Sequence, residues 1–299
     1  MSLLAVRGSG TLRGTSVLDQ PVHDSWAQDD DTSRLSPAER SADAPDALVV
    51  PSGAVPLVLL HAFPLSSLMW GPMLVDLPEL PILTIDLPGA GLSPAIEPVS
   101  IRAAGLAVAE SLRALGVRRA VLGGISMGGH VAMSVMKDAP ELLAGVVLMH
   151  TKAAPDDPEA RAARLRTAHA VLEMGSAEVL APMAAKMISP ASQASQPGLV
   201  ETVEHWIDQA TPGGVAWAAD AMAGRDDAMP ILRASGLPAT VIAGSEDQFA
   251  SVAQAEAITD GIGPTANLVV AAGIGHLGPL ETPNFMARVI RESYRRMLA

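Results

Sequence analysis

One pentapeptide, Gly124-Ile125-Ser126-Met127-Gly128, constrains this chain more than any other feature. It follows the apolar run Ala120-Val121-Leu122 and precedes a helix-like stretch at 129–136. A buried strand, a tight turn and a helix in this order place Ser126 at the tip of the turn. The glycines on either side are needed because such a turn leaves almost no room for side chains, and its strained backbone lifts the serine hydroxyl clear of the sheet.

A serine in this position points to nucleophilic chemistry, which requires a base and an acid that orients the base. Asp247 follows the apolar run 239–243, and His276 follows the next apolar run, 267–271. Both runs predict buried strands, and the carboxyl ends of parallel strands meet at the edge of a sheet where ligands bind. We therefore predict that Ser126, Asp247 and His276 form a catalytic triad at this edge.

Other residues compete for these roles. Glu246 is an alternative acid, and Asp247 is also placed to cap the helix that follows it. His150 ends a predicted strand at the same edge and is the rival base. The remaining polar candidates have structural interpretations: His61 braces a turn, and Asp86 accepts hydrogen bonds from the Pro-Gly turn after it. For His130, in the helix behind Ser126, we expect a packing role.

Six apolar runs predict the strands of the core. They are nearly continuous in valine, leucine and isoleucine rather than alternating, which is typical of strands covered on both faces. This pattern predicts an α/β fold with a mostly parallel, doubly wound sheet. The predicted strands are 57–61, 82–86, 120–125, 145–150, 239–243 and 267–271.

Two further motifs accompany the serine pentapeptide. Leu59-Leu60-His61-Ala62-Phe63-Pro64 follows an early strand, and Asp86-Leu87-Pro88-Gly89-Ala90-Gly91-Leu92-Ser93 follows the next one. Together with Leu277-Gly278-Pro279 after His276, they resemble the motifs of the α/β-hydrolase superfamily from about residue 46 onward. Within it, the chain is most similar to small esterases, 3-oxoadipate enol-lactonase-like enzymes and cofactor-free haloperoxidases or perhydrolases.

This resemblance implies an oxyanion hole made by the backbone N–H groups of Phe63 and Met127. It also implies that Ala62 replaces the glycine usual in the family. If that position needs a positive φ, the alanine carries strain of about 1 kcal/mol or more. Between 151 and 228 the strand rhythm stops, and four predicted helices resemble the cap of the family. The helices are 159–174, 176–187, 199–210 and 214–223, and the core comprises 46–150 and 229–299.

The first 45 residues are polar and rich in serine and aspartate. They show no sustained apolar periodicity, so we predict a largely disordered tail. Residues 17–22 are the one stretch there that favours a short edge strand.

Charge and composition restrict the partners. The net charge is −12, which disfavours nucleic acid and anionic membranes. There is no apolar run of about 18 residues for a membrane helix, and the short apolar start is not a signal peptide. The chain has no cysteine. We expect a cytoplasmic protein that needs no cofactor and no metal, since zinc motifs such as H-E-x-x-H are absent.

These observations predict an enzyme that cleaves a small-molecule carboxylic ester or lactone. Ser126 attacks the carbonyl, His276 takes its proton, and water releases the acyl group from the serine. Two alternatives stay open. In a perhydrolase, peroxide replaces water at the same acyl-enzyme, whereas a non-catalytic binding protein would have no use for an intact triad.

Overall fold

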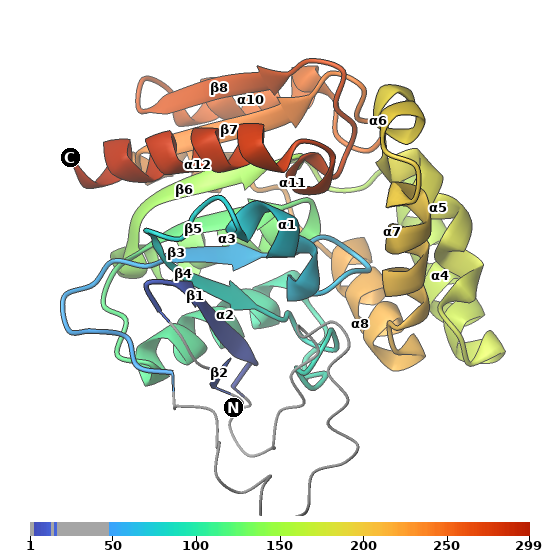
Figure 1. The fold of residues 1–299 in the computed structure, drawn as a ribbon. Coiled ribbons are helices and arrows are strands. Elements are labelled where there is room, and N and C mark those ends of the chain that lie inside the picture. The colour runs from blue at the N-terminus through green and yellow to red at the C-terminus, as the bar shows by residue number, and fades with distance from the viewer. Residues whose placement is uncertain (1–2, 13–14, 17–47) are drawn as a thin grey trace, which may run out of the picture.

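The centre of the molecule is a sheet of eight strands, as seen in the computed structural model, which describes residues 3–12, 15–16 and 48–299 (Figure 1). The strand order is β2-β1-β4-β3-β5-β6-β7-β8. Strands β3 to β8 run parallel, while β1 is antiparallel to both β2 and β4. The strands are β1 Val6–Gly10, β2 Thr15–Ser16, β3 Leu57–Leu60, β4 Pro81–Ile85, β5 Ala120–Ile125, β6 Leu143–Met149, β7 Ala239–Gly244 and β8 Ala266–Ala271.

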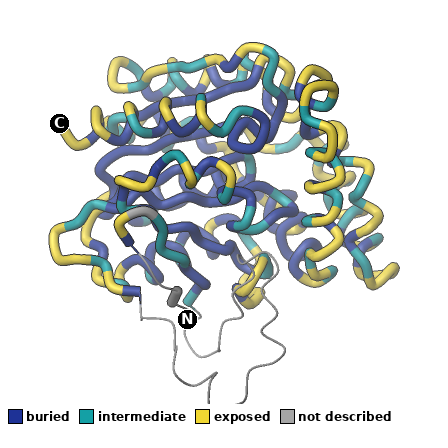
Figure 2. The backbone as a smooth tube through the Cα atoms, viewed as in Figure 1, coloured by how far each residue is buried: buried dark blue, intermediate teal, exposed yellow. Residues whose placement is uncertain are grey.

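Helices cover both faces of this sheet. In β3, Val58 and Leu60 pack toward one group of helices, and Leu57 and Leu59 toward another, because successive side chains of a strand point to opposite faces. The first group is α2 Ile101–Ala114, α3 Met127–Asp138, α9 Met229–Ser235 and α10 Val252–Ile262, and the second is α1 Gly71–Leu74, α11 Gly278–Glu281 and α12 Pro283–Leu298. Figure 2 shows the strands buried between helices whose outer surfaces are exposed. The predicted doubly wound, mostly parallel α/β fold is confirmed.

All six predicted strands are present, with ends that lie within two residues of the predicted ones. The central strands β5 and β6 are buried along their whole length. Continuous apolar runs were a reliable signal here because a strand covered on both faces exposes no side chain to water.

The long connection between β6 and β7 is helical. Its helices lie together beyond the carboxyl ends of the strands (Figure 1), and we call them the inserted helices. They are α4 Pro158–Met174, α5 Ala181–Met187, α6 Pro190–Ser195, α7 Leu199–Asp208 and α8 Pro212–Ala223, and the 3₁₀ turn η5 Glu178–Leu180 lies between α4 and α5. Two further 3₁₀ turns, η3 Ser67–Trp70 and η4 Pro140–Leu142, lie earlier in the chain.

Helix α6 is an addition to the four helices predicted there. Pro190 reads as a helix breaker, but it occupies the first turn of α6, where the missing N–H of proline costs nothing. The side chain of Ser189 caps this turn by accepting a hydrogen bond from the N–H of Ser192 at 3.2 Å.

The prediction of a disordered tail over residues 1–45 is wrong for residues 3–12. Strand β1 pairs with β4 over the full length of both strands, from Val6 opposite Ile85 to Gly10 opposite Pro81. The side chains of Leu4 and Leu12 are buried in the core against the sheet. The guanidinium of Arg7 lies 3.0 Å from the carboxylate of Asp86, so this segment also makes an ion pair with the loop that follows β4.

Sequence reasoning missed β1 for a physical reason. Its sequence, Val6-Arg7-Gly8-Ser9-Gly10, contains two glycines and no alternation, and glycine is depleted in strands. Pairing with β4, not local propensity, makes this segment extended. The edge strand predicted at 17–22 lies outside the described residues.

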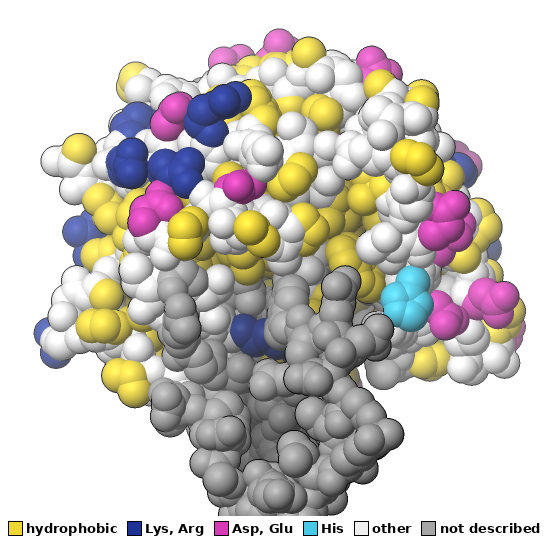
Figure 3. Space-filling view, in the orientation of Figure 1, with side chains coloured by type: hydrophobic (Ala, Val, Ile, Leu, Met, Phe, Trp, Pro, Cys, Tyr) yellow, Lys and Arg dark blue, Asp and Glu magenta, His cyan; other side chains and the backbone are white. Residues whose placement is uncertain are grey.

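On the face shown in Figure 3, Lys and Arg side chains gather with acidic side chains beside them. This region is over α12, whose Arg291 pairs with Glu79 at 2.5 Å. Exposed pairs of this kind contribute little to stability. None of the helices in the described ranges combines the length and the apolar character that a membrane crossing demands.

Candidate active site

Ser126 stands between β5 and α3 with a strained backbone. Its φ is +53°, a value that non-glycine residues rarely adopt, and its N–H donates to the carbonyl of Met149 at 2.9 Å. A Cβ on Gly124 would lie 2.2 Å from the carbonyl oxygen of Gly128, and a Cβ on Gly128 would lie 2.2 Å from that of Leu60. Only glycine fits either position, which explains the spacing of the pentapeptide.

Asp247 follows β7 and has a fully buried side chain. Its Oδ1 accepts backbone hydrogen bonds from Phe249 at 2.8 Å and Ala250 at 3.0 Å. Burial alone would raise the pKa of Asp247, but hydrogen bonds from His150 and His276 outweigh it and hold the pKa well below its ordinary value. The carboxylate is therefore ionised and acts only as an acceptor.

His276 follows β8, and its Nδ1 lies 2.9 Å from each oxygen of Asp247. Because the carboxylate only accepts, Nδ1 carries the proton and Nε2 is the basic nitrogen. The backbone N–H of His276 donates to Met187 of α5 at 2.8 Å, and the ring lies 4.9 Å from that of Phe249. The structure thus brings the predicted acid and the predicted base together.

His150, the rival base, approaches the same acid. Its Nδ1 lies 3.1 Å from Oδ2 of Asp247, and its side chain is fully buried. The His150 and His276 rings meet edge to face with centroids 6.0 Å apart. Within the described residues, His150 Nε2 has no hydrogen-bond partner. His150 and Ser126 are also the two non-glycine residues of this part of the chain with positive φ, a strain that tends to mark functional positions.

Ser126 and His276 both line one cavity of about 280 Å³. The core contributes Phe63, His130 and His150, and α4, α5 and α8 of the inserted helices contribute the opposite wall. Much of that wall is apolar, as is usual for small-molecule sites. Besides Phe63, the large apolar side chains of the whole cavity are Leu180, Met183, Met187 and Met222 from the inserted helices and the turn between them, and Phe249 from the loop after β7.

The two predicted oxyanion donors come from different segments of the chain. Phe63 lines the cavity, and Met127 begins α3 directly after Ser126. In the ranges that the structure covers, the N–H groups of both residues donate to no protein acceptor. Ala62 does not have a positive φ, so the strain considered for it does not arise. Its N–H faces the sulfur of Met69 at 3.3 Å.

The polar residues with structural interpretations behave as predicted. His61 donates from Nδ1 to the carbonyl of Ala62 at 3.0 Å and accepts at Nε2 from Leu87 at 2.9 Å. Burial lowers its pKa, so the ring stays neutral. Asp86 accepts from the N–H groups of Ser67 at 2.9 Å and Leu92 at 3.0 Å. His130 is buried as expected, although it also lines the cavity.

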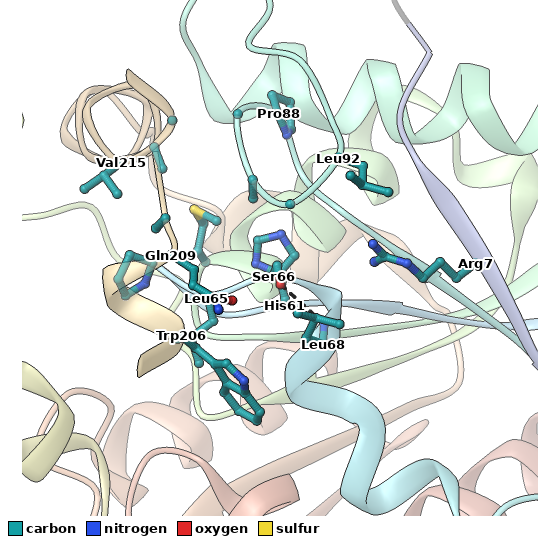
Figure 4. Close-up of a pocket in the computed structure, with 18 residues that line it drawn as sticks. Arg7, His61, Leu65, Ser66, Leu68, Pro88, Leu92, Trp206, Gln209 and Val215 are labelled. Atoms are coloured by element: carbon teal, nitrogen blue, oxygen red, sulfur yellow. Dashed lines mark hydrogen bonds between the residues drawn. The ribbon is translucent and has the colours of Figure 1, made fainter. Parts of the chain in front are cut away.

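A second cavity, of about 210 Å³ (Figure 4), is lined by Pro64, the residue after Phe63 of the first cavity. Arg7 reaches it from β1, and Trp206 and Gln209 reach it from α7 and the residues after it. Ser126, Asp247 and His276 are not among its lining residues. The positive charge of Arg7 is matched by Asp86, so the second cavity contains no surplus charge at this point.

Sequence reasoning missed a charged cluster on the wall of the first cavity. Lys152, Asp156 and Arg164 line it, and Arg225 packs behind Asp156. Residues 156 and 225 are distant in the chain, and nothing in their spacing indicates that they meet.

One group of residues has the composition and closeness of a metal site. The ligand atoms of His150, Asp247 and His276 lie within 4.8 Å of one another. Both Nδ1 atoms point at the carboxylate in hydrogen-bond geometry, however. In this structure the Nδ1 atoms and the carboxylate are therefore engaged with one another.

The model of the alpha/beta hydrolase family matches residues 57–289, which include every residue of the site. A thermophilic esterase from Thermogutta terrifontis is 34% identical, with a TM-score of 0.78 over 82% of this chain and 90% of that one. A 3-oxoadipate enol-lactonase of Acinetobacter baylyi is 27% identical over 70% of this chain and 75% of its own length.

An enol-lactonase from Burkholderia xenovorans shares the fold, with a TM-score of 0.73 at 22% identity over 82% of this chain and 93% of that one. The family match spans far more than half of the chain and includes strands β3 to β8 and the inserted helices. This chain therefore belongs to the alpha/beta hydrolase family.

Proposed function

We propose that this protein is a serine hydrolase that cleaves a carboxylic ester or lactone through an acyl-enzyme. One observation carries the proposal: the buried Asp247 holds the Nδ1 of His276, and His276 and Ser126 line the same cavity. The esterase and enol-lactonase relatives support a hydrolase activity.

In the proposed mechanism, Nε2 of His276 takes the proton of Ser126 as the Oγ atom attacks the substrate carbonyl. The N–H groups of Phe63 and Met127 stabilise the oxyanion, each contributing roughly 3 kcal/mol. The C–O bond to the leaving alcohol then breaks, and His276 returns the proton to that oxygen. Water, deprotonated by the same imidazole, attacks the acyl-enzyme and frees the acid and Ser126.

Asp247 keeps the imidazole in its Nδ1–H tautomer and stabilises the imidazolium that forms in each step. The inserted helices act as a cap in this proposal, because α4, α5 and α8 close the side of the cavity opposite the sheet. The partner of the site is a small molecule in the cytoplasm, not nucleic acid or a membrane, and the reaction uses no cofactor.

Hydrolysis of a panel of p-nitrophenyl esters and small lactones tests the proposal. We expect turnover of short and medium acyl chains, with complete inhibition after treatment with a fluorophosphonate that reacts with activated serines. A parallel assay with hydrogen peroxide measures the rate of peracid formation. A rate of peracid formation above the rate of hydrolysis would favour a perhydrolase. A folded protein that turns over no ester or lactone and takes up no probe would contradict the proposal.

We assign His150 the role of positioning Asp247 rather than of the base. Its Nδ1 donates to Oδ2 of Asp247, which fixes the carboxylate that in turn orients His276. His150→Ala should lower kcat about tenfold, since a hydrogen bond to a charged group is lost. His150→Asn should restore most of that loss, because asparagine tolerates positive φ and keeps an N–H donor.

Measured kcat and KM separate the two roles of His150. A positioning role changes kcat modestly, leaves KM nearly unchanged and allows rescue by asparagine. If His150 were the base, His150→Asn would be as inactive as His276→Asn, and the assignment would be reversed.

A further inference from the structure

The wall of the Ser126 cavity carries an unusual group of charges. Lys152 lies just after β6, and Arg164 projects from α4. The side-chain nitrogens of both approach the carboxylate of Asp156, Lys152 at 3.4 Å and Arg164 at 2.5 Å. All three residues line the cavity that contains Ser126 and His276.

Arg225 alone already balances the charge of Asp156 and donates a hydrogen bond to each of its carboxylate oxygens. The guanidinium of Arg225 makes two parallel hydrogen bonds to the carboxylate, at 2.6 and 2.7 Å. The exposed fractions of the two side chains are 3% for Arg225 and 1% for Asp156, so this is a buried bidentate pair. Burial would raise the pKa of Asp156, but hydrogen bonds from Arg225 and Arg164 lower it far below its ordinary value, and the carboxylate is ionised.

Lys152 and Arg164 are therefore surplus cations. With Arg225 they supply three positive charges against one carboxylate. Their side chains are 24% and 26% exposed, and both residues line the cavity. In the described part of the chain, Nη2 of Arg164 has no acceptor, since Nε and Nη1 make the hydrogen bonds of this side chain.

The positive charge of this cluster affects the neighbouring His130. Burial lowers the pKa of His130, and the charges of Arg225, Arg164 and Lys152 lower it further. His130 lines the same cavity, so the field of the cluster extends into it. The chain as a whole has a net charge of −12, which repels anions. Attraction of an anion to this site must therefore come from local cations.

We propose that Lys152 and Arg164 bind a carboxylate carried by the acyl part of the substrate. The preferred substrate is then a half-ester of a dicarboxylic acid or a lactone with a carboxylate side chain. Arg164 offers a free N–H to one carboxylate oxygen, and Lys152 neutralises the charge. This inference rests on the proposed function and names the substrate class of the same site.

A matched pair of substrates tests this proposal. One is 4-nitrophenyl hydrogen adipate, which is anionic, and the other, called the alkyl ester below, is the 4-nitrophenyl ester of an uncharged alkanoic acid with the same acyl length. The wild-type protein should prefer the anionic ester by about tenfold or more in kcat/KM at low ionic strength. Lys152→Gln and Arg164→Gln should each remove about tenfold from the anionic ester and change the alkyl ester less than about twofold. Salt should reduce the preference.

Lys186→Gln and Arg166→Gln are the control variants. Both residues are exposed on α5 and α4 and lie outside the lining of the cavity, so the preference should survive their loss of charge. A merely structural role of Lys152 and Arg164 would lower kcat/KM for both esters by the same factor, and that result would overturn the proposal. So would a wild-type protein that does not prefer the anion.

Calorimetric titration of Ser126→Ala with monomethyl adipate supplies a readout that needs no turnover, because this variant lacks the proposed nucleophile. Binding should weaken about tenfold when Lys152→Gln or Arg164→Gln is added to Ser126→Ala, and equal binding by Ser126→Ala and these double variants would refute the carboxylate site. Failure of the proposed function gives a different result, namely no Ser126 labelling and no hydrolysis of either ester. Hydrolysis of both esters without anion preference would leave the proposed function standing and reject this inference alone.

Discussion

Ser126→Ala should reduce kcat for a p-nitrophenyl ester by a factor on the order of 10⁵ to 10⁶ and abolish fluorophosphonate labelling. The loss is this large because in the proposed mechanism Ser126 Oγ alone forms the covalent bond to the acyl group, so no other group of the site replaces it. The backbone at φ +53° is unchanged by the substitution, and the melting temperature should stay close to that of the wild type. Initial rates and the intact mass after probe treatment measure both effects.

Ser245→Ala is the matched control for this prediction. Ser245 lies in the loop that also holds Asp247, but its hydroxyl accepts a hydrogen bond from Gly273 at 2.8 Å. Activity and labelling should therefore persist in Ser245→Ala. A probe adduct that remains in Ser126→Ala and disappears in Ser245→Ala would show that the nucleophile is misassigned.

Asp247→Asn should lower kcat on the order of 10⁴-fold. Both carboxylate oxygens of Asp247 accept hydrogen bonds, from two backbone N–H groups at Oδ1 and from the imidazoles at both oxygens. An asparagine presents one NH₂ group, which would face donors on whichever side it occupies. His276 is then released from its Nδ1–H tautomer, and its Nε2 is no longer reliably basic.

Glu246→Gln removes the same negative charge one residue away. Glu246 is exposed, and its backbone N–H donates to Ile274 at 2.9 Å, a contact that the substitution keeps. This variant should keep nearly full kcat. Circular dichroism and melting temperature establish that both variants are folded before rates are compared. Greater damage from Glu246→Gln than from Asp247→Asn would identify Glu246 as the acid.

The parts of the fold that the sequence predicted are those fixed by short-range constraints. A strand covered on both faces must be apolar throughout, which is why 120–125 was recognisable. The glycines at 124 and 128 are demanded by contacts with the backbone of Gly128 and Leu60. Asp247 and His276 were predicted to be neighbours because each follows a strand, and β7 and β8 pair directly.

The parts that sequence reasoning missed depend on contacts between distant segments. Strand β1 is extended because it pairs with β4, and its own residues give little indication of a strand. The contact of His150 with Asp247 requires β6 and β7 to be adjacent. The pair of Asp156 with Arg225 requires the segment before α4 to meet the end of α8, and no periodicity encodes that meeting.

The order of the strands along the chain has a consequence for synthesis on the ribosome. Strands β1 and β3 to β6 are all present once residue 149 has been made, whereas β7 begins only at Ala239, after the inserted helices. At about 5 to 20 residues per second, the emerging chain passes some 5 to 20 s with the β7 side of β6 unpaired. Ser126 is thus made well before the acid and base that we propose for it. If the proposed triad is correct, a nascent chain holds the nucleophile but is inactive until its last two strands join the sheet.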